Sequence, residues 1–395
     1  MRPLAGVRVL DLTRLLPGPY ATRLLADLGA EVVKIEDPER GDYLRELQPE
    51  WFAWLNAGKR GARIDLKHPD GREVLLNLAS RADALLEGFR PGVIDRLGLS
   101  PAALWERNPR LVIVSLSGYG ADGPYRDRAG HDLNYLAASG LLSLFPPGPD
   151  GTPLLPPLQL GDLSAGLQAA LAAVAGILHA RTVGHGLHVD IPILGALWSL
   201  GGYLLAAAAA RGGLHRSDLP LAGTMACYRC YRTADGGILS VGALEPRFWA
   251  EFCLAAGHPE WIARQNDRDQ EALAAEVAAV VAAKPAAEWA RIAAQVPSAC
   301  LEVAVDPSAA PHHPQARALD AFAQGDVKGP RPPWRVRPAT GGGFRHPESP
   351  EKRDAQGGTA HDILSWAGYD QDRIRELLEA GVVSDPASVR TRETG

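Results

Sequence analysis

Short apolar runs alternate with stretches of helical periodicity through the first half of the chain. Residues 7–12 form an apolar run, residues 20–28 place apolar side chains at helical spacing, and residues 31–36 form a second β-rich run. The alternation continues through a helix at 71–80 to a strand at 111–116. Strands and helices in this order predict an α/β fold with a parallel sheet covered by helices on both faces.

The second half of the chain indicates a change of domain. A long apolar helix at 163–181, a strand at 188–191 and a helix at 194–211 continue the first pattern. A strand, a turn and several alanine-rich helices follow and predict a smaller α+β domain. Residues 327–350 are dense in Pro and Gly, which predicts an extended return segment. The predicted domains are 1–200 (large), 215–325 (small) and 326–395 (return segment and closing helix).

Composition and charge are those of an ordinary globular protein. The chain has 395 residues, of which 46% are hydrophobic and 22% charged, and this length favours two domains. It carries 41 Lys and Arg against 46 Asp and Glu, without a basic block. We therefore expect no nucleic-acid partner.

Segments for targeting, cross-linking or metal binding are not expected either. No apolar run reaches about 18 residues, and the longest candidate, 194–210, is interrupted by Gly. The N-terminus has the pattern of a strand, so we expect a cytoplasmic protein without a membrane partner. Four cysteines in so long a chain predict no disulfide framework. Cys227 and Cys230 face opposite sides of a predicted strand, which argues against a shared metal.

Three polar residues in different parts of the chain are candidates for proton transfer. His131 lies in a loop beyond the strand 111–116, at the sheet edge where α/β proteins bind ligands. Asp162 stands at the start of the long helix as a potential N-cap, and Glu245 follows a predicted strand in a position to orient an imidazole. A surface histidine, a plain helix cap and a solvated glutamate explain the same residues without catalysis.

Basic residues in the first hundred positions are candidates for binding phosphate. Lys34, Lys59 and Arg60 belong to this set, and most of its members are expected to be solvated. Arg90 is the best candidate, because a Pro-Gly turn after a strand holds it in place for bidentate contact with phosphate. No dinucleotide fingerprint or P-loop accompanies the alternating strands and helices, so these do not predict dinucleotide binding.

Several short motifs together resemble the family III CoA-transferase family, also called CaiB/BaiF. They are PLAGVRVLDL at 3–12, LGAEVVKIE at 28–36, DLK at 65–67, RPG at 90–92, SGYG at 117–120, AGHDLNY at 129–135 and GALEP at 242–246. Within that family the chain is most similar to the α-methylacyl-CoA racemase branch. The resemblance implies a Rossmann-like large domain built from both chain ends, a small domain, and an interlocked homodimer. It also implies that His131 and Asp162 meet Glu245 across the dimer.

Two chemistries follow from the resemblance. In the racemase branch, the residues matching His131 and Asp162 face each other across the α-carbon of an acyl-CoA thioester, and the glutamate matching Glu245 pairs with the histidine. In the transferases, the aspartate matching Asp162 attacks the thioester to form an acyl-aspartyl anhydride, guarded by a glycine-rich loop. Leu244-Glu245-Pro246 stands in place of that loop, which favours the racemase.

The resemblance also assigns the ligand. CoA enters as part of the thioester substrate, its phosphates fall to Arg90 and neighbouring cations, and no further cofactor or metal is required. Asp37 stands where the racemases commonly carry an Arg that touches the adenine nucleotide, so Lys34 or Arg40 would substitute. The stretch around Asp162 also departs from the racemase pattern and keeps the transferase hypothesis open. A third hypothesis, a CoA-thioester binder without catalysis, has no need of paired acid and base groups.

Overall fold

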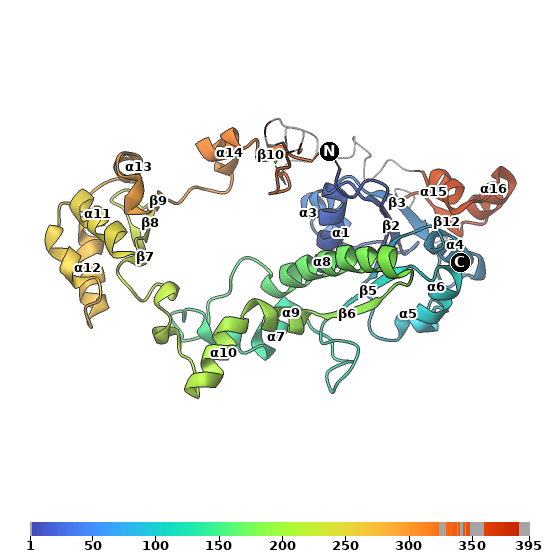
Figure 1. Ribbon diagram of the computed structural model, residues 1–395, viewed down its shortest axis with the longest axis horizontal. Helices are drawn as coiled ribbons and strands as arrows, with labels where there is room; N and C mark the ends of the chain where they lie inside the picture. Colours follow the sequence, from blue (N-terminus) through green and yellow to red (C-terminus); the bar gives the residue numbers. More distant parts are fainter. Residues whose placement is uncertain are drawn as a thin grey trace, which may run out of the picture. The chain divides into compact units, whose positions relative to one another are not determined.

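The computed structural model describes residues 2–323, 329–337, 339, 343, 345–347 and 359–386. The chain divides into two compact units: 1–142, 155–205 and 318–395 form the first, and 143–154 and 206–317 form the second (Figure 1). Residues 143–154 fall inside the large domain predicted over 1–200 but group with the second unit. Most of them form a short hairpin, with a bridge between Pro147 and Pro153. Much of the predicted return segment lies outside the described residues.

A seven-stranded sheet forms the centre of the first unit, in the order β12-β3-β2-β1-β4-β5-β6. Its parallel strands are β1 (Arg8–Leu12), β2 (Glu31–Glu36), β3 (Arg60–Ile64), β4 (Ala84–Glu87), β5 (Val112–Ser117) and β6 (His188–Pro192). Strand order reverses on either side of β1, which pairs with both β2 and β4. The predicted α/β fold with a mostly parallel sheet is confirmed, and the switch point at β1 is where such sheets bind ligands.

Both ends of the chain contribute to this unit. The C-terminal helices α15 (Ala360–Ala367) and α16 (Gln371–Glu379) lie beside the N-terminal strands in Figure 1, and the edge strand β12 (Val383–Ser384) pairs antiparallel with β3. They share one apolar core with α4 (Pro69–Ala79) and α6 (Pro101–Arg107). The shorter elements of this unit are α2 (Leu44–Leu47), α3 (Pro49–Asn56), α5 (Val93–Arg96), α7 (Asp132–Ala138), β10 (Phe322–Ala323) and β11 (Gly329–Pro330), and α14 (Pro314–Ala318) ends the second unit.

The longest helix, α8 (Leu160–Val183), packs against α1 (Pro17–Asp27) and β5. Glycines make the contact close: a Cβ on Gly166 would lie 2.6 Å from the carbonyl oxygen of Pro17, and one on Gly176 would lie 2.6 Å from Val112. With a mean hydropathy of 1.6, α8 is long and apolar enough to cross a membrane by composition alone, although half of that window is buried inside the protein. A core helix has the same composition.

The helix predicted over 194–211 is in fact two helices. α9 (Ile193–Leu200) and α10 (Gly202–Arg211) meet at an angle of 70°, and the pair together passes the same test of hydropathy. The break falls at Gly201, where a Cβ would lie 2.5 Å from Leu141. Close packing against another helical turn therefore ends a pattern that the apolar sequence alone would continue.

The second unit has its own sheet and core. Strands β7 (Tyr228–Arg232), β8 (Ile238–Gly242) and β9 (Leu301–Val303) pair antiparallel, with helices α11 (Pro246–Ala256), α12 (Gln270–Val281) and α13 (Ala286–Gln295) packed on them. Three tryptophans fill the core: Trp249, Trp261 and Trp289. All four cysteines are free, with Cys227 buried and Cys230 exposed, as the strand pattern predicts.

Candidate active site

The first candidate residue, His131, is exposed and immediately precedes α7 beyond the carboxyl end of β5. Its backbone N–H donates to Oδ1 of Asn134 (3.0 Å). Tyr135 donates its hydroxyl to the carbonyl oxygen of Gly130 (2.6 Å), and a Cβ on Gly118 or Gly130 would lie only 2.6 or 2.7 Å from its ring. The Gly, Asn and Tyr of this motif therefore build the turn that presents His131.

Asp162 lies in the first turn of α8, which corrects the prediction that it is the N-cap. The helix begins at Leu160, after Gln159. Oδ1 of Asp132 accepts the backbone N–H groups of Gly161 (2.7 Å) and Asp162 (3.0 Å). A carboxylate from the neighbouring residue of His131 thus satisfies the amides that a local cap would otherwise bind. This bridge ties the histidine motif to the helix that carries Asp162.

Burial makes the carboxyl of Asp162 an unusually weak acid. Desolvation raises the pKa of its carboxyl to about 7, and the nearby negative charge of Asp132 adds to the increase. Burial also raises the pKa of Tyr135 to about 12, with a contribution from Asp162. Near neutral pH, Asp162 is therefore populated both with and without its proton, as a group that gives and takes protons must be.

We predict that two substitutions of Asp132 separate the effect of its charge from the effect of its hydrogen bonds. Asp132→Asn keeps an oxygen for the two amides but removes the charge, so the fold should persist while the limb of the pH–rate profile that reports Asp162 moves to lower pH. Asp132→Ala also removes the acceptor and should lower the free energy of unfolding by about 1–2 kcal/mol. Urea unfolding and pH–rate profiles of both variants check this. An unmoved profile in Asp132→Asn would contradict the electrostatic role of Asp132.

Arg90 lies at the same edge of the sheet, in the loop after β4. Its side chain is exposed, and its positive charge is close enough to Tyr135 to oppose the increase in that residue's pKa. Two further arginines gather at this loop: a Cβ on Gly92 would lie 3.5 Å from guanidinium nitrogens of both Arg96 and Arg126. Neither Arg96 nor Arg126 is singled out in the sequence analysis. Arg96 could have been found, because it lies only four residues after Gly92 of the Pro-Gly turn.

Lys34 and Lys59 are buried and already paired. Nζ of Lys59 donates to Asp11 (3.0 Å), to the carbonyl oxygen of Pro19 (3.0 Å) and to Asn56 (2.8 Å), so all three of its donors are used. Nζ of Lys34 bonds the carbonyl oxygen of Thr13 (2.8 Å) and pairs with Asp42 (3.0 Å). These contacts tie both buried lysines to β1 and the segment after it, and Lys59 has no donor left for a phosphate.

Arg60 is directed to the other end of the sheet. It opens β3, pairs with Glu31 at the start of β2, and lies over the ring of Trp366. The carboxyl ends of the strands carry His131 and Asp162, whereas Arg60 occupies an amino end. Of the four cations predicted to contact CoA, the geometry therefore favours only Arg90, and we assign Lys34, Lys59 and Arg60 a structural role.

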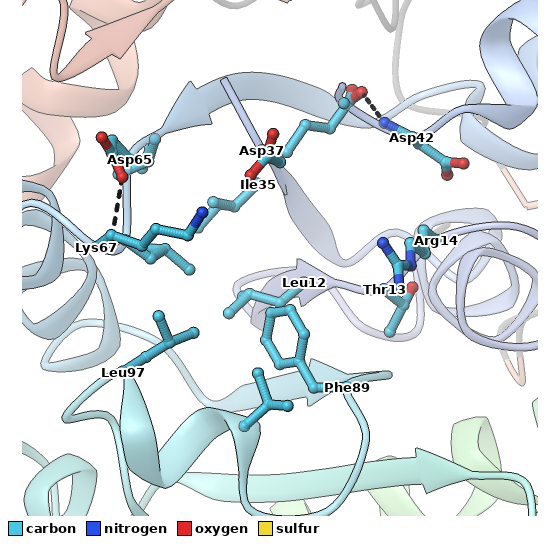
Figure 2. Close-up of a pocket in the computed structure, with 15 residues that line it drawn as sticks. Leu12, Thr13, Arg14, Ile35, Asp37, Asp42, Asp65, Lys67, Phe89 and Leu97 are labelled. Atoms are coloured by element: carbon cyan, nitrogen blue, oxygen red, sulfur yellow. Dashed lines mark hydrogen bonds between the residues drawn. The ribbon is translucent and has the colours of Figure 1, made fainter. Parts of the chain in front are cut away.

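A cavity of about 190 Å³ opens at the carboxyl ends of β1, β2 and β3, next to the loop after β4 (Figure 2). Phe89, Leu12 and Leu97 form an apolar wall, and Asp37 and Lys67 lie on the opposite side in Figure 2. An apolar wall with a few charged groups is typical of a site for a small organic ligand. The position at the switch point of the sheet is equally typical.

Glu245 lies in the second unit, between β8 and α11. Its side chain is exposed and makes no hydrogen bond or ion pair with any residue that the structure describes. Burial raises the pKa of the nearby Cys300 thiol, and the charge of Glu245 adds to this. The structure thus connects the His131 turn to Asp162 through Asp132, places Asp162 and Arg90 near Tyr135 of the same turn, and carries Glu245 in the second unit.

A model of the family described as CoA-transferase family III matches residues 4–351. The chain belongs to this family. Family III relatives include the mouse α-methylacyl-CoA racemase, 34% identical over 96% of this chain and 97% of the relative. A probable fatty acyl-CoA transferase of Mycobacterium tuberculosis is 33% identical over 74% of this chain and 80% of the relative. Mouse succinyl-CoA:glutarate CoA-transferase is 35% identical over 66% and 61%.

Solved structures agree with the family III fold. The crystal structure of the Mycobacterium tuberculosis protein Rv3272 superposes with a TM-score of 0.74 at 31% identity, covering 85% of this chain and 94% of that one. A CaiB/BaiF family protein from Brucella suis superposes with a TM-score of 0.75 over 93% and 99%, at 24% identity, and supports the fold alone. The relatives named above include both a racemase and CoA-transferases. Among the described residues, no group of His, Cys, Asp and Glu is arranged to hold a metal.

Proposed function

We propose that this family III enzyme is an acyl-CoA racemase or epimerase, which exchanges the α-proton of a 2-methyl-branched acyl-CoA thioester. The observation that carries the proposal is the Asp132 bridge, which joins the turn presenting His131 to the helix carrying Asp162. Desolvation raises the pKa of Asp162 to about 7, so near neutral pH its carboxyl is ready both to give a proton and to take one. Reversible epimerisation needs this balance.

The reaction transfers protons on both faces of one carbon. The α-C–H of a thioester is a weak acid, and its removal gives an enolate that preorganised donors stabilise. One of His131 and Asp162 takes the proton and the other returns one to the opposite face, so the pair starts each turnover in opposite protonation states. The cycle is balanced, since the enzyme gains one proton and delivers one.

Glu245 completes the proposed site from a second copy of the chain, by pairing with His131 and fixing its tautomer. An exposed apolar stripe along α8 supports a homodimer: Leu167, Leu171 and Leu178 are 50%, 69% and 67% exposed, and their spacing places them on one helix face. A second copy is the partner that the proposed site requires.

CoA is the proposed source of binding energy. Arg90, Arg96 and Arg126 provide the positive charge for its phosphates, and the cavity in Figure 2 accepts its nucleotide end. Interactions far from the reacting carbon then orient the acyl group between the two bases. No additional cofactor enters this chemistry.

CoA transfer between carboxylic acids is the second candidate function, favoured by the transferases among the relatives. There the Asp162 carboxylate attacks the thioester carbonyl, the C–S bond breaks, and CoA leaves as a thiolate while an acyl-aspartyl anhydride remains. The GALEP segment at 242–246 offers no glycine-rich loop to guard such an anhydride, which favours the racemase.

Two assays on the same enzyme separate these functions. Chiral chromatography of a (2R)-2-methylacyl-CoA after incubation should show the (2S) isomer accumulating to near equality. Hydroxylamine trapping followed by peptide mass spectrometry should leave Asp162 unmodified. Retained configuration, with a hydroxamate on Asp162 and CoA moving to added free acids, would assign the transferase instead.

A further inference from the structure

A single buried amide fastens the loop that carries Glu245. Gln265, 6% exposed, follows the 3₁₀ segment Pro259–Arg264. Its Nε2 donates to the carbonyl oxygen of Leu244 (2.7 Å) and, at greater length, to that of Ala243 (3.4 Å). Ala243 is fully buried, so its carbonyl oxygen has no access to water and needs a partner inside the protein.

Gln265 is itself held in place. Nε2 of Gln270 donates to the backbone carbonyl oxygens of Gln265 (3.1 Å) and Asp267 (2.8 Å), and its Oε1 accepts the N–H of Ala226 (2.9 Å). On the far side of the loop, the N–H of Ala243 donates to the carbonyl oxygen of Cys227 (2.8 Å). The loop is therefore clamped from both sides through its main chain.

The Glu245 side chain has no such anchor within the described part of the chain. Its carboxylate forms no hydrogen bond with the second unit, so its location depends on the backbone that the clamp fixes. A glutamine suits the clamp because its NH₂ group offers two donors to two carbonyl oxygens. Methionine has a similar size and no donor, and an ionised glutamate would direct negative charge at both oxygens.

We propose that Gln265 is a positioning residue for the reaction, which sets the location of Glu245 and thereby the strength of its pairing with the catalytic histidine. This inference rests on the proposed function of Glu245. It assigns the rigidity of the GALEP loop to a side chain twenty residues further along the chain. A displacement of Glu245 by about 1 Å is enough to cost up to about 100-fold in rate, as misplacement does elsewhere in enzymes.

The test compares Gln265→Met with a matched control variant. We expect Gln265→Met to lower kcat for epimerisation by about 10- to 100-fold with little change in KM. Thr233→Val is the control, since it also removes a buried polar group of the same unit (Thr233 is 3% exposed) at the opposite end of β7 and β8. An equal loss of kcat in both variants, or no loss in Gln265→Met, would overturn the proposal.

A double variant separates this proposal from the proposed function. If Gln265 acts through Glu245, Gln265→Met should have no further effect in a Glu245→Gln background. Full additivity there, with a slow Glu245→Gln enzyme, would overturn the role of Gln265 alone. A Glu245→Gln enzyme at the wild-type rate would overturn the proposed role of Glu245 and this inference with it.

A second variant covers the case in which Gln265→Met does not fold. Gln265→Glu keeps the shape and offers a donor only when protonated, so its kcat relative to wild type should rise as the pH falls. A ratio that stays constant with pH would overturn the proposal, because a purely structural defect has no reason to titrate with this side chain.

Discussion

Replacement of Asp162 by Asn should slow epimerisation by orders of magnitude while making the protein more stable above neutral pH. The amide can neither take nor give the proton, and loss of a positioned acid–base group typically costs about 10²–10⁴-fold in rate. The substitution keeps the size of the side chain, so thioester binding should change little. Steady-state kinetics with both isomers of a 2-methylacyl-CoA check this, and a rate within tenfold of wild type would contradict it.

The stability effect follows from the raised pKa of Asp162. Its folded value of about 7 exceeds the ordinary value of 3.8, so the folded state holds the proton more tightly than the unfolded state. The favourable contribution is complete below pH 4 and is lost as the pH rises towards 7. Asn cannot ionise, so Asp162→Asn should be more stable than wild type at pH 8, by up to about 4 kcal/mol, with a smaller difference at pH 5.

Urea unfolding at the two pH values measures this difference directly. Asp150 provides the matched control, because it is an exposed aspartate whose pKa is lowered by its bonds to Thr152. Asp150→Asn should show no gain at pH 8. Equal stability of wild type and Asp162→Asn at both pH values would mean that burial does not raise the pKa of the Asp162 carboxyl.

Replacement of His131 by Gln should have the second largest effect, and it should be one-sided. Epimerisation needs both bases and should fall by about 10²–10⁴-fold. The isomer whose α-proton faces Asp162 still meets an intact base, so its proton should continue to exchange with solvent, with its configuration retained. The other isomer should lose exchange altogether.

Proton exchange of each separate isomer, followed by mass spectrometry and chiral chromatography, distinguishes these outcomes. The control is His185→Gln, an exposed histidine before the amino end of β6 and therefore at the opposite edge of the sheet, which should behave as wild type. Unchanged exchange of both isomers in His131→Gln would remove the imidazole from the mechanism.

Local patterns predict most of the fold because the central strands β1, β2, β4 and β5 are buried on both faces. These four strands appear as short apolar runs, and the helices between them keep their periodicity. Long-range contacts account for the errors. The helix predicted over 194–211 breaks where Gly201 packs against Leu141, a contact that no local pattern encodes.

The same distinction holds at the candidate site. The motifs around His131 and Asp162 identify both residues as candidates. Local sequence also suggests Asp162 as the cap of α8, because the acceptor that the structure shows, Asp132, lies thirty residues upstream. Lys59 has the sequence environment of a surface cation. It is buried because Asp11 compensates its charge from a different strand, and partners at such separation are invisible in one sequence.

The most direct test of the central claim, that His131 and Asp162 serve opposite faces of one carbon, is incubation of the wild-type enzyme with a single isomer of a 2-methylacyl-CoA in deuterated water. We predict that one deuterium enters the α-carbon, that the product of opposite configuration carries it from the first turnover, and that both isomers become labelled. Full recovery of unlabelled substrate, with CoA still transferable to an added carboxylic acid, would contradict the account.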